Sequence, residues 1–450
     1  MLRGMYAVVV GAGEVGQYIA EMLGREGHDV AVIDRDAERL QQLADEADAL
    51  TIVGNGASRR VLLEANVTNA AILMAVTDSD EVNMIACMVA KRAGVPLTVA
   101  RIRNEDYVEP GKGVSSDFTG IDRVIQPEAA VAEQVGRLAD YPGTLEVESF
   151  ANGQVSMVEV RVDRHSTVVG KRIMDMGLPR GVLITGLLTR GEVAMPRGST
   201  VLGQEDTVFI VGIPDPVKQT AALLSGHRKE RHSAMVLGCG DIGLQIALEL
   251  ENRGLRPKVL EKDHERAMEA AAVLSHCLVL HDEGLSESFL LSEGVDEVGL
   301  FVAATGDDRL NMLAALQAKR LGAQRTIAVV ETSDFTRVLQ SMGVDVAVSP
   351  RQLTASAVLR YVRKGEVVNA ALLDKSAGEV LELRVSPNSA VSRSPLREGR
   401  FPRGAVLAVL VRGEEVIMAR GDSVPRPGDL AIVFSAEEAV TEVERMFRSR

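Results

Sequence analysis

The sequence predicts an α/β protein in which two doubly wound parallel-sheet domains are each followed by a small α+β domain. One observation is a glycine-rich turn that follows an apolar run and opens a helical pattern, at Gly11 and again at Gly238. Another is that the two turns belong to a longer internal repeat, whose offset of 238 − 11 = 227 residues persists at later motifs. The third is that the apolar runs lack polar alternation, which indicates strands buried on both faces of a parallel sheet. Internal duplication is stronger evidence than any single motif.

The first quarter of the chain alternates strand and helix patterns. The predicted strands are YAVVV, DVAVID, ALTIVG, AAILMAVT and LTVARI, and helical patterns such as VGQYIAEMLGREG and AERLQQLADEA lie between them. This alternation predicts a Rossmann-like sheet with helices on both faces. A further helical stretch begins at Pro127 and leads out of the domain.

Residues 144–224 change to short strands separated by turns, such as TLEVESF and DTVFIVG, and residues 365–446 repeat that pattern. The sequence therefore predicts two copies of each domain type. The expected domains are a Rossmann-like nucleotide-binding domain at 1–133, a crossover helix with a small α+β domain at 134–225, a polar linker at 226–233, a second Rossmann-like domain at 234–360 and a second small α+β domain at 361–450.

Composition excludes several classes of protein. The formal net charge is -13 without a long basic tract, so binding to nucleic acid over a broad surface is not expected. The three cysteines show no CxxC spacing, which argues against a zinc site and fits a reducing compartment. No apolar run approaches the roughly 18–20 residues that span a bilayer. We therefore expect a cytoplasmic protein whose association with a membrane comes through a partner.

The first glycine turn has the residue types that a nucleotide needs. Gly11 permits the tight turn off the strand, Gly13 lets a phosphate approach the backbone, and Gly16 lets helix and strand pack closely. The helix N-terminus then offers N–H groups to the anion. Asp34 ends the next strand, where a carboxylate binds the ribose diol and repels a 2′-phosphate. NAD(H), ADP or ATP is therefore expected in preference to NADP.

Other candidates follow the neighbouring strands. Thr77 and Asp78 follow AILMAV, and Arg101 ends LTVAR. The ligand crevice of such a sheet opens at the carboxyl ends of its strands, so Arg101 is placed to pair with a phosphate. A surface salt bridge is the alternative role for this arginine.

The second turn keeps Gly238, Gly240 and Gly243, and Glu261 takes the place of Asp34 (34 + 227 = 261). Pairing VAR of the first half with VVE of the second puts Glu331 opposite Arg101. An anion there disfavours a polyphosphate, so the second site is expected to bind a smaller or different nucleotide, or none.

No catalytic constellation accompanies the two nucleotide folds. A dehydrogenase needs a substrate domain that brings an acid–base group to the nicotinamide, and the small modules carry no recognisable pair. Two nucleotide sites without attached chemistry indicate a sensor, in which bound nucleotide favours one domain arrangement over another. The chain is therefore not expected to be an enzyme.

Several motifs together resemble those of a known family. The segments GAGEVGQYIAEML, VGNGASRRVLLEAN, AVTDSDEVNMIAC and ARIRNEDY are similar to the signature of the Trk potassium-uptake regulatory proteins of the TrkA type, which are built from tandem regulator-of-K⁺-conductance (RCK) units. The resemblance covers essentially the whole chain. The first-site contacts that it implies are Gly11, Ala12, Gly13, Glu14, Val15, Asp34, Thr77, Asp78 and Arg101. The second-site contacts that it implies are Gly238, Cys239, Gly240, Asp241, Ile242, Glu261, Thr305 and Gly306, with Glu331 at the position given to the arginine.

The resemblance also implies ligands and partners. They are NAD(H) and ATP or ADP, a homotetramer, and a membrane potassium translocator of the TrkH or TrkG type on the cytoplasmic side of the inner membrane. A regulator of another cation channel or antiporter, and an NAD-dependent oxidoreductase, are the alternative functions.

Overall fold

The fold is described from a computed structural model. The described residues are 4–25, 27–104, 107, 119–189, 192–226, 233–331, 339, 342–362, 367–372, 378–399 and 401–449. Most of the predicted linker at 226–233 lies outside them. The chain divides into two compact units, of which the first comprises Met1–Val131 and Ser349–Val362 and the second comprises Ala132–Val348 and Arg363–Arg450.

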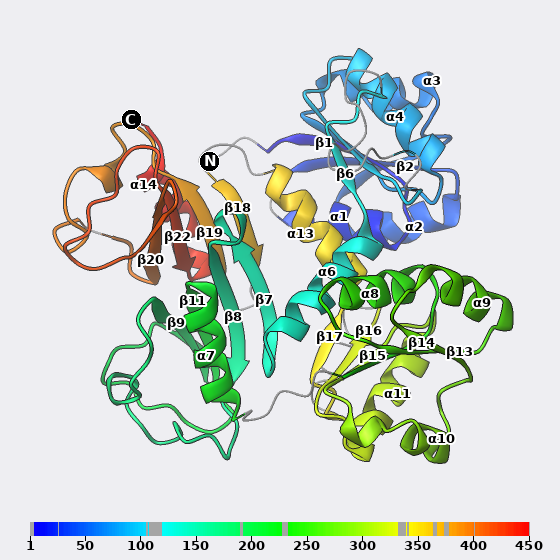
Figure 1. The fold of residues 1–450 in the computed structure, drawn as a ribbon. Helices are drawn as coiled ribbons and strands as arrows, with labels where there is room; N and C mark the ends of the chain where they lie inside the picture. Colours follow the sequence, from blue (N-terminus) through cyan, green and yellow to red (C-terminus); the bar gives the residue numbers. More distant parts are fainter. Residues whose placement is uncertain are drawn as a thin grey trace. The chain divides into compact units, whose positions relative to one another are not determined.

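The first unit is built on a parallel sheet (Figure 1). Its strands are β1 (Tyr6–Val10), β2 (Asp29–Asp34), β3 (Ala49–Val53), β4 (Ile72–Ala75), β5 (Leu97–Arg101) and β6 (Arg123–Ile125). Its helices are α1 (Glu14–Arg25), α2 (Ala37–Glu46), α3 (Arg59–Glu64), α4 (Asp80–Arg92), the first residues of α6 (Pro127–Asp140) and α13 (Pro350–Val362). The strand order β3-β2-β1-β4-β5-β6 confirms the predicted doubly wound topology.

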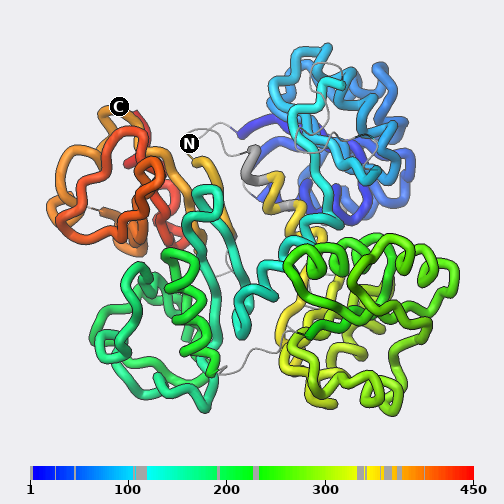
Figure 2. Tube along the Cα trace, in the orientation of Figure 1, coloured from blue at the N-terminus to red at the C-terminus, as the bar shows by residue number. Residues whose placement is uncertain are grey.

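Helices cover both faces of this sheet because all its central strands are apolar on both sides. Side chains of α1 and α2 form one core with the sheet, and side chains of α3 and α4 form the other. Helix α13, which follows the last strand of the second parallel sheet in sequence, packs against α1 (Figure 2). Its Val358 is fully buried among Ile19, Leu23 and other residues of the first core.

The second unit contains the second parallel sheet. Its strands are β12 (Ala234–Leu237), β13 (Lys258–Glu261), β14 (Leu278–His281), β15 (Leu300–Ala303), β16 (Thr326–Val329) and β17 (Val346–Val348). The helices around it are α8 (Asp241–Asn252), α9 (His264–Val273), α10 (Glu287–Ser292) and α11 (Asp308–Leu321). The order β14-β13-β12-β15-β16-β17 repeats that of the first sheet strand for strand, which confirms the predicted duplication.

Both small modules also lie in the second unit. The first has β7 (Thr144–Phe150), β8 (Val155–Arg161), β9 (Val182–Thr189), β10 (Glu192–Ala194), β11 (Thr207–Gly212) and α7 (Pro214–Ser225). The second has β18 (Val367–Leu372), β19 (Glu379–Arg384), β20 (Ala405–Arg412), β21 (Glu415–Met418), β22 (Leu430–Ser435) and α14 (Val440–Phe447). Their antiparallel sheets have the equivalent orders β7-β8-β11-β9-β10 and β18-β19-β22-β20-β21. The two sheets share a core in which the rings of Phe209 and Phe434 lie 5.5 Å apart.

Candidate functional site

In the first glycine turn, one of the three glycines has open space where a side chain would begin, and the other two are closely packed. Gly11 adopts a φ of +109°, and a Cβ there would lie 3.1 Å from the main-chain nitrogen of Thr77. A Cβ on Gly16 would lie 1.9 Å from the carbonyl oxygen of Gly11. At Gly13 the nearest atom to such a Cβ is a guanidinium nitrogen of Arg39 at 3.9 Å. The turn is therefore closed by packing at its two ends and accessible at Gly13, beside the N-terminus of α1.

Asp34, at the end of β2, is tied to this turn. Its Oδ2 accepts a hydrogen bond from the main-chain N–H of Ala12, and its Oδ1 accepts one from Asp36 at 2.9 Å. The carboxylate keeps further lone pairs for a ribose diol, since each oxygen accepts more than one bond. Asp34 therefore fixes the turn, and it lies at the position where the sequence predicts contact with a ribose.

A buried amide positions the strand ends on the other side of the turn. The side chain of Asn83 in α4 is fully buried, and its Oδ1 accepts from the main-chain N–H of Thr77 at 2.9 Å and from the Thr77 hydroxyl at 2.7 Å. Its Nδ2 donates to the carbonyl oxygens of Thr77 and Arg101. Asn83 thereby joins the ends of β4 and β5. The sequence prediction missed this residue, although an asparagine at the same place in both halves signalled it.

Arg101 lies at the end of β5 and is paired with two acids. Its guanidinium is 2.8 Å from Glu128 of α6 and 3.6 Å from Asp78. The Arg101 and Glu128 side chains are each only 15% exposed, whereas Asp78 is 83% exposed. The Nε of Arg101 is buried and has no hydrogen-bond partner among the described residues. Both readings of Arg101 thus have support, since it forms a salt bridge and retains an unused donor.

Two further arginines flank the first turn, and the sequence prediction named neither. Arg39, in the first turn of α2, is the nearest group to the open side of Gly13. Arg351, in the first turn of α13, forms an ion pair with Glu14, the first residue of α1. Arg39 could have been found from the repeat, because Arg266 occupies the same place beside Gly240. Arg351 is distant in sequence and gave no such signal.

The second turn has the same construction. Gly238 has a φ of +94°, and a Cβ on Gly243 would lie 2.1 Å from the carbonyl oxygen of Gly238. Glu261 is buried and accepts from the main-chain N–H of Cys239 at 2.6 Å, as Asp34 does from Ala12. Burial, and to a lesser extent the negative charge of Glu261, raises the pKa of the Cys239 thiol to about 11. Asp241 and Ile242 open α8 behind this turn.

The strand ends of the second sheet correct one expectation. Asn311 binds Thr305 as Asn83 binds Thr77, but its Nδ2 donates to the carbonyl oxygen of Val329 at 2.8 Å. Val329, and not Glu331, is therefore the counterpart of Arg101. The pairing of VAR with VVE was wrong by two residues, because it matched letters and not strand register.

Glu331 instead occupies the place of Arg103. The main-chain N–H of Glu331 donates to Asp308, as that of Arg103 donates to Asp80. The second site has thus lost the strand-end cation by replacement with valine. Gly306, which follows Thr305, stands where the first site has Asp78 and has no side chain to offer.

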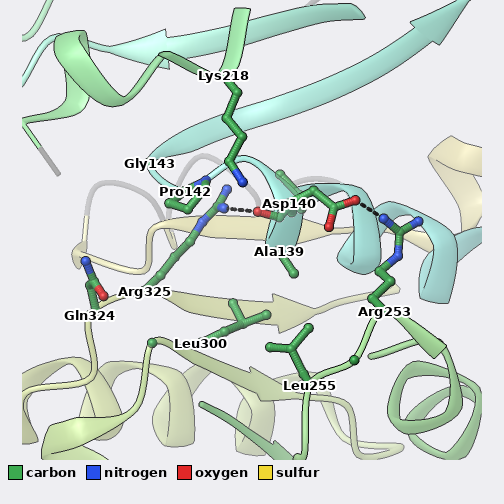
Figure 3. Close-up of a pocket in the computed structure, with 13 residues that line it drawn as sticks. Ala139, Asp140, Pro142, Gly143, Lys218, Arg253, Leu255, Leu300, Gln324 and Arg325 are labelled. Carbon is green, nitrogen blue, oxygen red and sulfur yellow. Dashed lines mark hydrogen bonds and ion pairs between the residues drawn. The ribbon is translucent and has the colours of Figure 1, made fainter. Parts of the chain in front are cut away.

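A cavity of about 280 Å³ lies elsewhere in the second unit (Figure 3). It borders Leu300 and Arg325, which stand at the amino ends of β15 and β16, whereas the glycine turn lies at the carboxyl ends. The Arg325 side chain is buried and donates to the carbonyl oxygens of Leu138 in the last turn of α6, of Tyr141 just after it, and of Thr144, the first residue of β7. Burial lowers its pKa to about 10. The cavity is therefore separate from the second glycine turn, and its arginine holds the end of α6.

Among the described residues, no group of His, Cys, Asp and Glu side chains is arranged to hold a metal ion. Within the same residues, no helix is long and apolar enough to cross a bilayer.

Comparisons with known proteins agree with this duplicated architecture. The sequence model of the TrkA-N domain matches residues 7–127 and again residues 234–350, and that of the TrkA-C domain matches residues 157–225. The two TrkA-N matches coincide with the two glycine turns and their sheets.

Relatives extend over the full length of the chain. The Trk system potassium uptake protein TrkA homolog 1 of Methanosarcina mazei is 34% identical over 99% of this chain and 100% of that protein. The TrkA proteins of Haemophilus influenzae and Azorhizobium caulinodans are 32% and 35% identical, each over 99% of both chains.

Solved structures share the fold. The GsuK channel superposes with a TM-score of 0.65 at 18% identity, over 97% of this chain and 78% of that chain. The GsuK channel bound to NAD gives 0.63 at 17% identity, over 99% and 79%. The fold is thus that of RCK domains, and the relatives are named as Trk system potassium uptake proteins, not as enzymes. With TrkA-N matches at both parallel sheets and full-length relatives above 30% identity, the chain belongs to the TrkA family of Trk system potassium uptake proteins.

Proposed function

We propose that this chain is the nucleotide-sensing regulatory subunit that gates a TrkH- or TrkG-type potassium translocator, and that NAD(H) and ATP or ADP are its ligands. The observation that supports this most strongly is the accessible Gly13 at the N-terminus of α1, with Asp34 on one side and Arg101 at the neighbouring strand end.

Each part of a nucleotide has a matching group in the first site. The main-chain N–H groups at the start of α1 bind phosphates, because they are unpaired and carry the positive end of the helix dipole. The Asp34 carboxylate binds the ribose. Arg101 binds a terminal phosphate through its guanidinium, which then leaves or shares Glu128. The second site has Val329 in place of Arg101 and so lacks this cation. We therefore propose that it binds polyphosphates more weakly.

Gating follows from differential affinity of the two states of the assembly for nucleotide. A coupling of about 1–3 kcal/mol changes the balance of two states by roughly 5- to 150-fold without turnover. The GsuK structures with NAD and with ADP support nucleotides as ligands of RCK domains, since these are the ligands named for that channel.

For the assembly we propose a homotetramer of closed symmetry on the cytoplasmic side of the inner membrane, held there by the translocator. Light scattering on the purified chain should give a mass near four times 48.2 kDa. A stable monomer at micromolar concentration would contradict this assembly.

The function is tested by potassium flux in proteoliposomes that contain a TrkH-type protein with and without this chain. ATP, ADP and NADH are added separately, and calorimetry on the same preparation measures their binding. We expect flux to depend on nucleotide only when the chain is present, with no nucleotide consumed. Flux that never responds to any of the three would reject the gating role.

A second candidate is regulation of another cation channel or antiporter. The likeness to the GsuK channel over 97% of the chain favours it, because that channel carries the same tandem domains. The two candidates separate in the flux assay, since a regulator of a different protein binds nucleotide yet leaves TrkH-type flux unchanged.

A further inference from the structure

The first glycine turn receives a cation from the second repeat of the chain. Arg351 is the second residue of α13, whose apolar side packs on α1 within the first unit. Its guanidinium forms an ion pair with the carboxylate of Glu14. The first unit therefore holds a charged contact between its nucleotide turn and a residue encoded more than three hundred positions later.

Glu14 is badly placed for a turn that binds phosphate. It is the first residue of α1, next to Gly13, where phosphates approach the free N–H groups. The Glu14 carboxylate repels phosphates there, and in the absence of ligand Arg351 balances its negative charge. Glu14 is 58% exposed and free to turn toward water, whereas the Arg351 side chain is 19% exposed and held at the site. Burial lowers the pKa of Arg351, so a strong anionic partner is needed to offset its desolvation.

The two repeats differ in where they carry their arginine. Pro127 and Pro350 begin the equivalent helices α6 and α13, so Glu128 and Arg351 occupy the same position after them. In the first repeat the strand end has Arg101 and the helix has Glu128. In the second repeat the strand end has Val329 and the helix has Arg351. Because α13 packs on α1, both arginines belong to the unit with the first turn, which suits a ligand that carries several negative charges.

We propose that Arg351 is a phosphate-binding residue of the first nucleotide site. When a nucleoside di- or triphosphate or a dinucleotide binds, the Arg351 guanidinium leaves Glu14 and pairs with the phosphates of the ligand. This inference rests on the proposed nucleotide binding. The second repeat thus contributes directly to recognition at the first site, and Glu14 competes with the ligand for Arg351.

The competition gives a test based on the sign of two effects. Arg351→Ala should weaken binding of ATP, ADP and NADH by about tenfold or more, because a charge-assisted contact to phosphate is lost. Glu14→Gln should tighten the same binding several-fold, because the competing carboxylate and its repulsion are removed. If the pair only stabilises the fold, both substitutions break it alike and affinity moves in the same direction, which would overturn the proposal.

The experiment is calorimetry on the full chain, in a Gly240→Phe background that silences the second turn. A side chain at Gly240 projects into the space where phosphate approaches, and its φ of −69° suits any residue. Adenosine, which has no phosphate, should bind all variants equally. Arg351→Lys should restore most of the affinity that Arg351→Ala loses.

Arg320→Ala is the matched control, since it breaks an Arg–Glu pair with Glu287 on the surface of the second unit and should leave first-site affinity unchanged. Thermal unfolding and circular dichroism confirm that each variant is folded. If the unsubstituted chain binds no nucleotide, the proposed function fails. If it binds nucleotide and Arg351→Ala binds equally well, only the role of Arg351 fails.

Discussion

The side-chain amide of Asn83 donates a hydrogen bond to the main-chain carbonyl oxygen of Arg101 at 2.9 Å, and the same amide group holds both the N–H and the hydroxyl of Thr77. One buried side chain thus fixes the ends of two strands at the place where a ligand would lie. The equivalent bond from Asn311 to Val329 shows that this arrangement serves the fold in both repeats, whether the strand ends in arginine or in valine.

Asn83→Ala should therefore lower both stability and first-site affinity. Several buried polar groups lose their partner at once, and each such loss costs about 1–3 kcal/mol. We expect the free energy of unfolding to fall by at least that amount in urea titration. Asn311→Ala should destabilise the chain to a similar extent while leaving nucleotide binding at the first site intact. Equal loss of first-site binding in both variants would contradict this.

Asp34→Ala should weaken binding of NAD(H), ADP and ATP at the first site by about 1.5–3 kcal/mol, the value of a charge-assisted hydrogen bond. Asp34 also accepts from Ala12 and Asp36, so the turn loses support in the same variant. Asp34→Asn separates the effects, because its amide oxygen still accepts one of these bonds. Calorimetry measures both variants, and unchanged affinity in Asp34→Ala would refute the ribose assignment.

Arg101→Ala should blunt the flux response to ATP more than Glu331→Ala does. Arg101 has a buried, unused Nε at the strand end of the first site, whereas Glu331 lies at the position of Arg103 in the second repeat. The measurement is nucleotide-dependent flux in proteoliposomes on both variants. A response in Arg101→Ala as large as that of the unsubstituted chain would show that this arginine is only a salt bridge to Glu128.

Two glycines of the same helix should respond in opposite directions to alanine. Gly16→Ala places a Cβ 1.9 Å from the carbonyl oxygen of Gly11, so we expect strong destabilisation. Gly24→Ala meets no atom within 4 Å and should stabilise the chain by about 0.5–1 kcal/mol, since alanine is the better helix former. Thermal unfolding compares the two. Similar melting temperatures would mean that α1 and β1 are not packed as described.

Alkylation of Cys239 should report on the second turn and rise with pH. Because the pKa of this thiol is raised to about 11, the reactive thiolate is scarce at neutral pH and its population increases about tenfold per pH unit up to that value. Peptide-resolved mass spectrometry follows the labelling between pH 7 and 9. Protection by ADP or NADH would indicate binding at the second turn, and a pH-independent rate would contradict the raised pKa of the thiol.

The sequence was sufficient for features that are local in the chain. Gly11, Gly16 and Asp34 were predictable because a tight turn and the acid after the next strand follow from spacing within one strand–helix–strand segment. The counterpart of Arg101 was not, because identity of letters gives no strand register, whereas the asparagine amide marks that register directly. Arg351 was also out of reach, since no periodicity within one repeat predicts that α13 packs on the helix of the other.

The burial of Val358 beneath the first sheet also bears on biosynthesis. A ribosome completes the six strands of the first sheet, on which α1 packs, long before it reaches α13, so the part of α1 that contacts α13 is covered only once that helix has emerged. During most of translation the nascent first domain therefore lacks the cover that Val358 provides over this part of its core. A chaperone that binds exposed apolar side chains would therefore have a long window to act there, and a chain that ends before residue 350 would keep that part of the core uncovered.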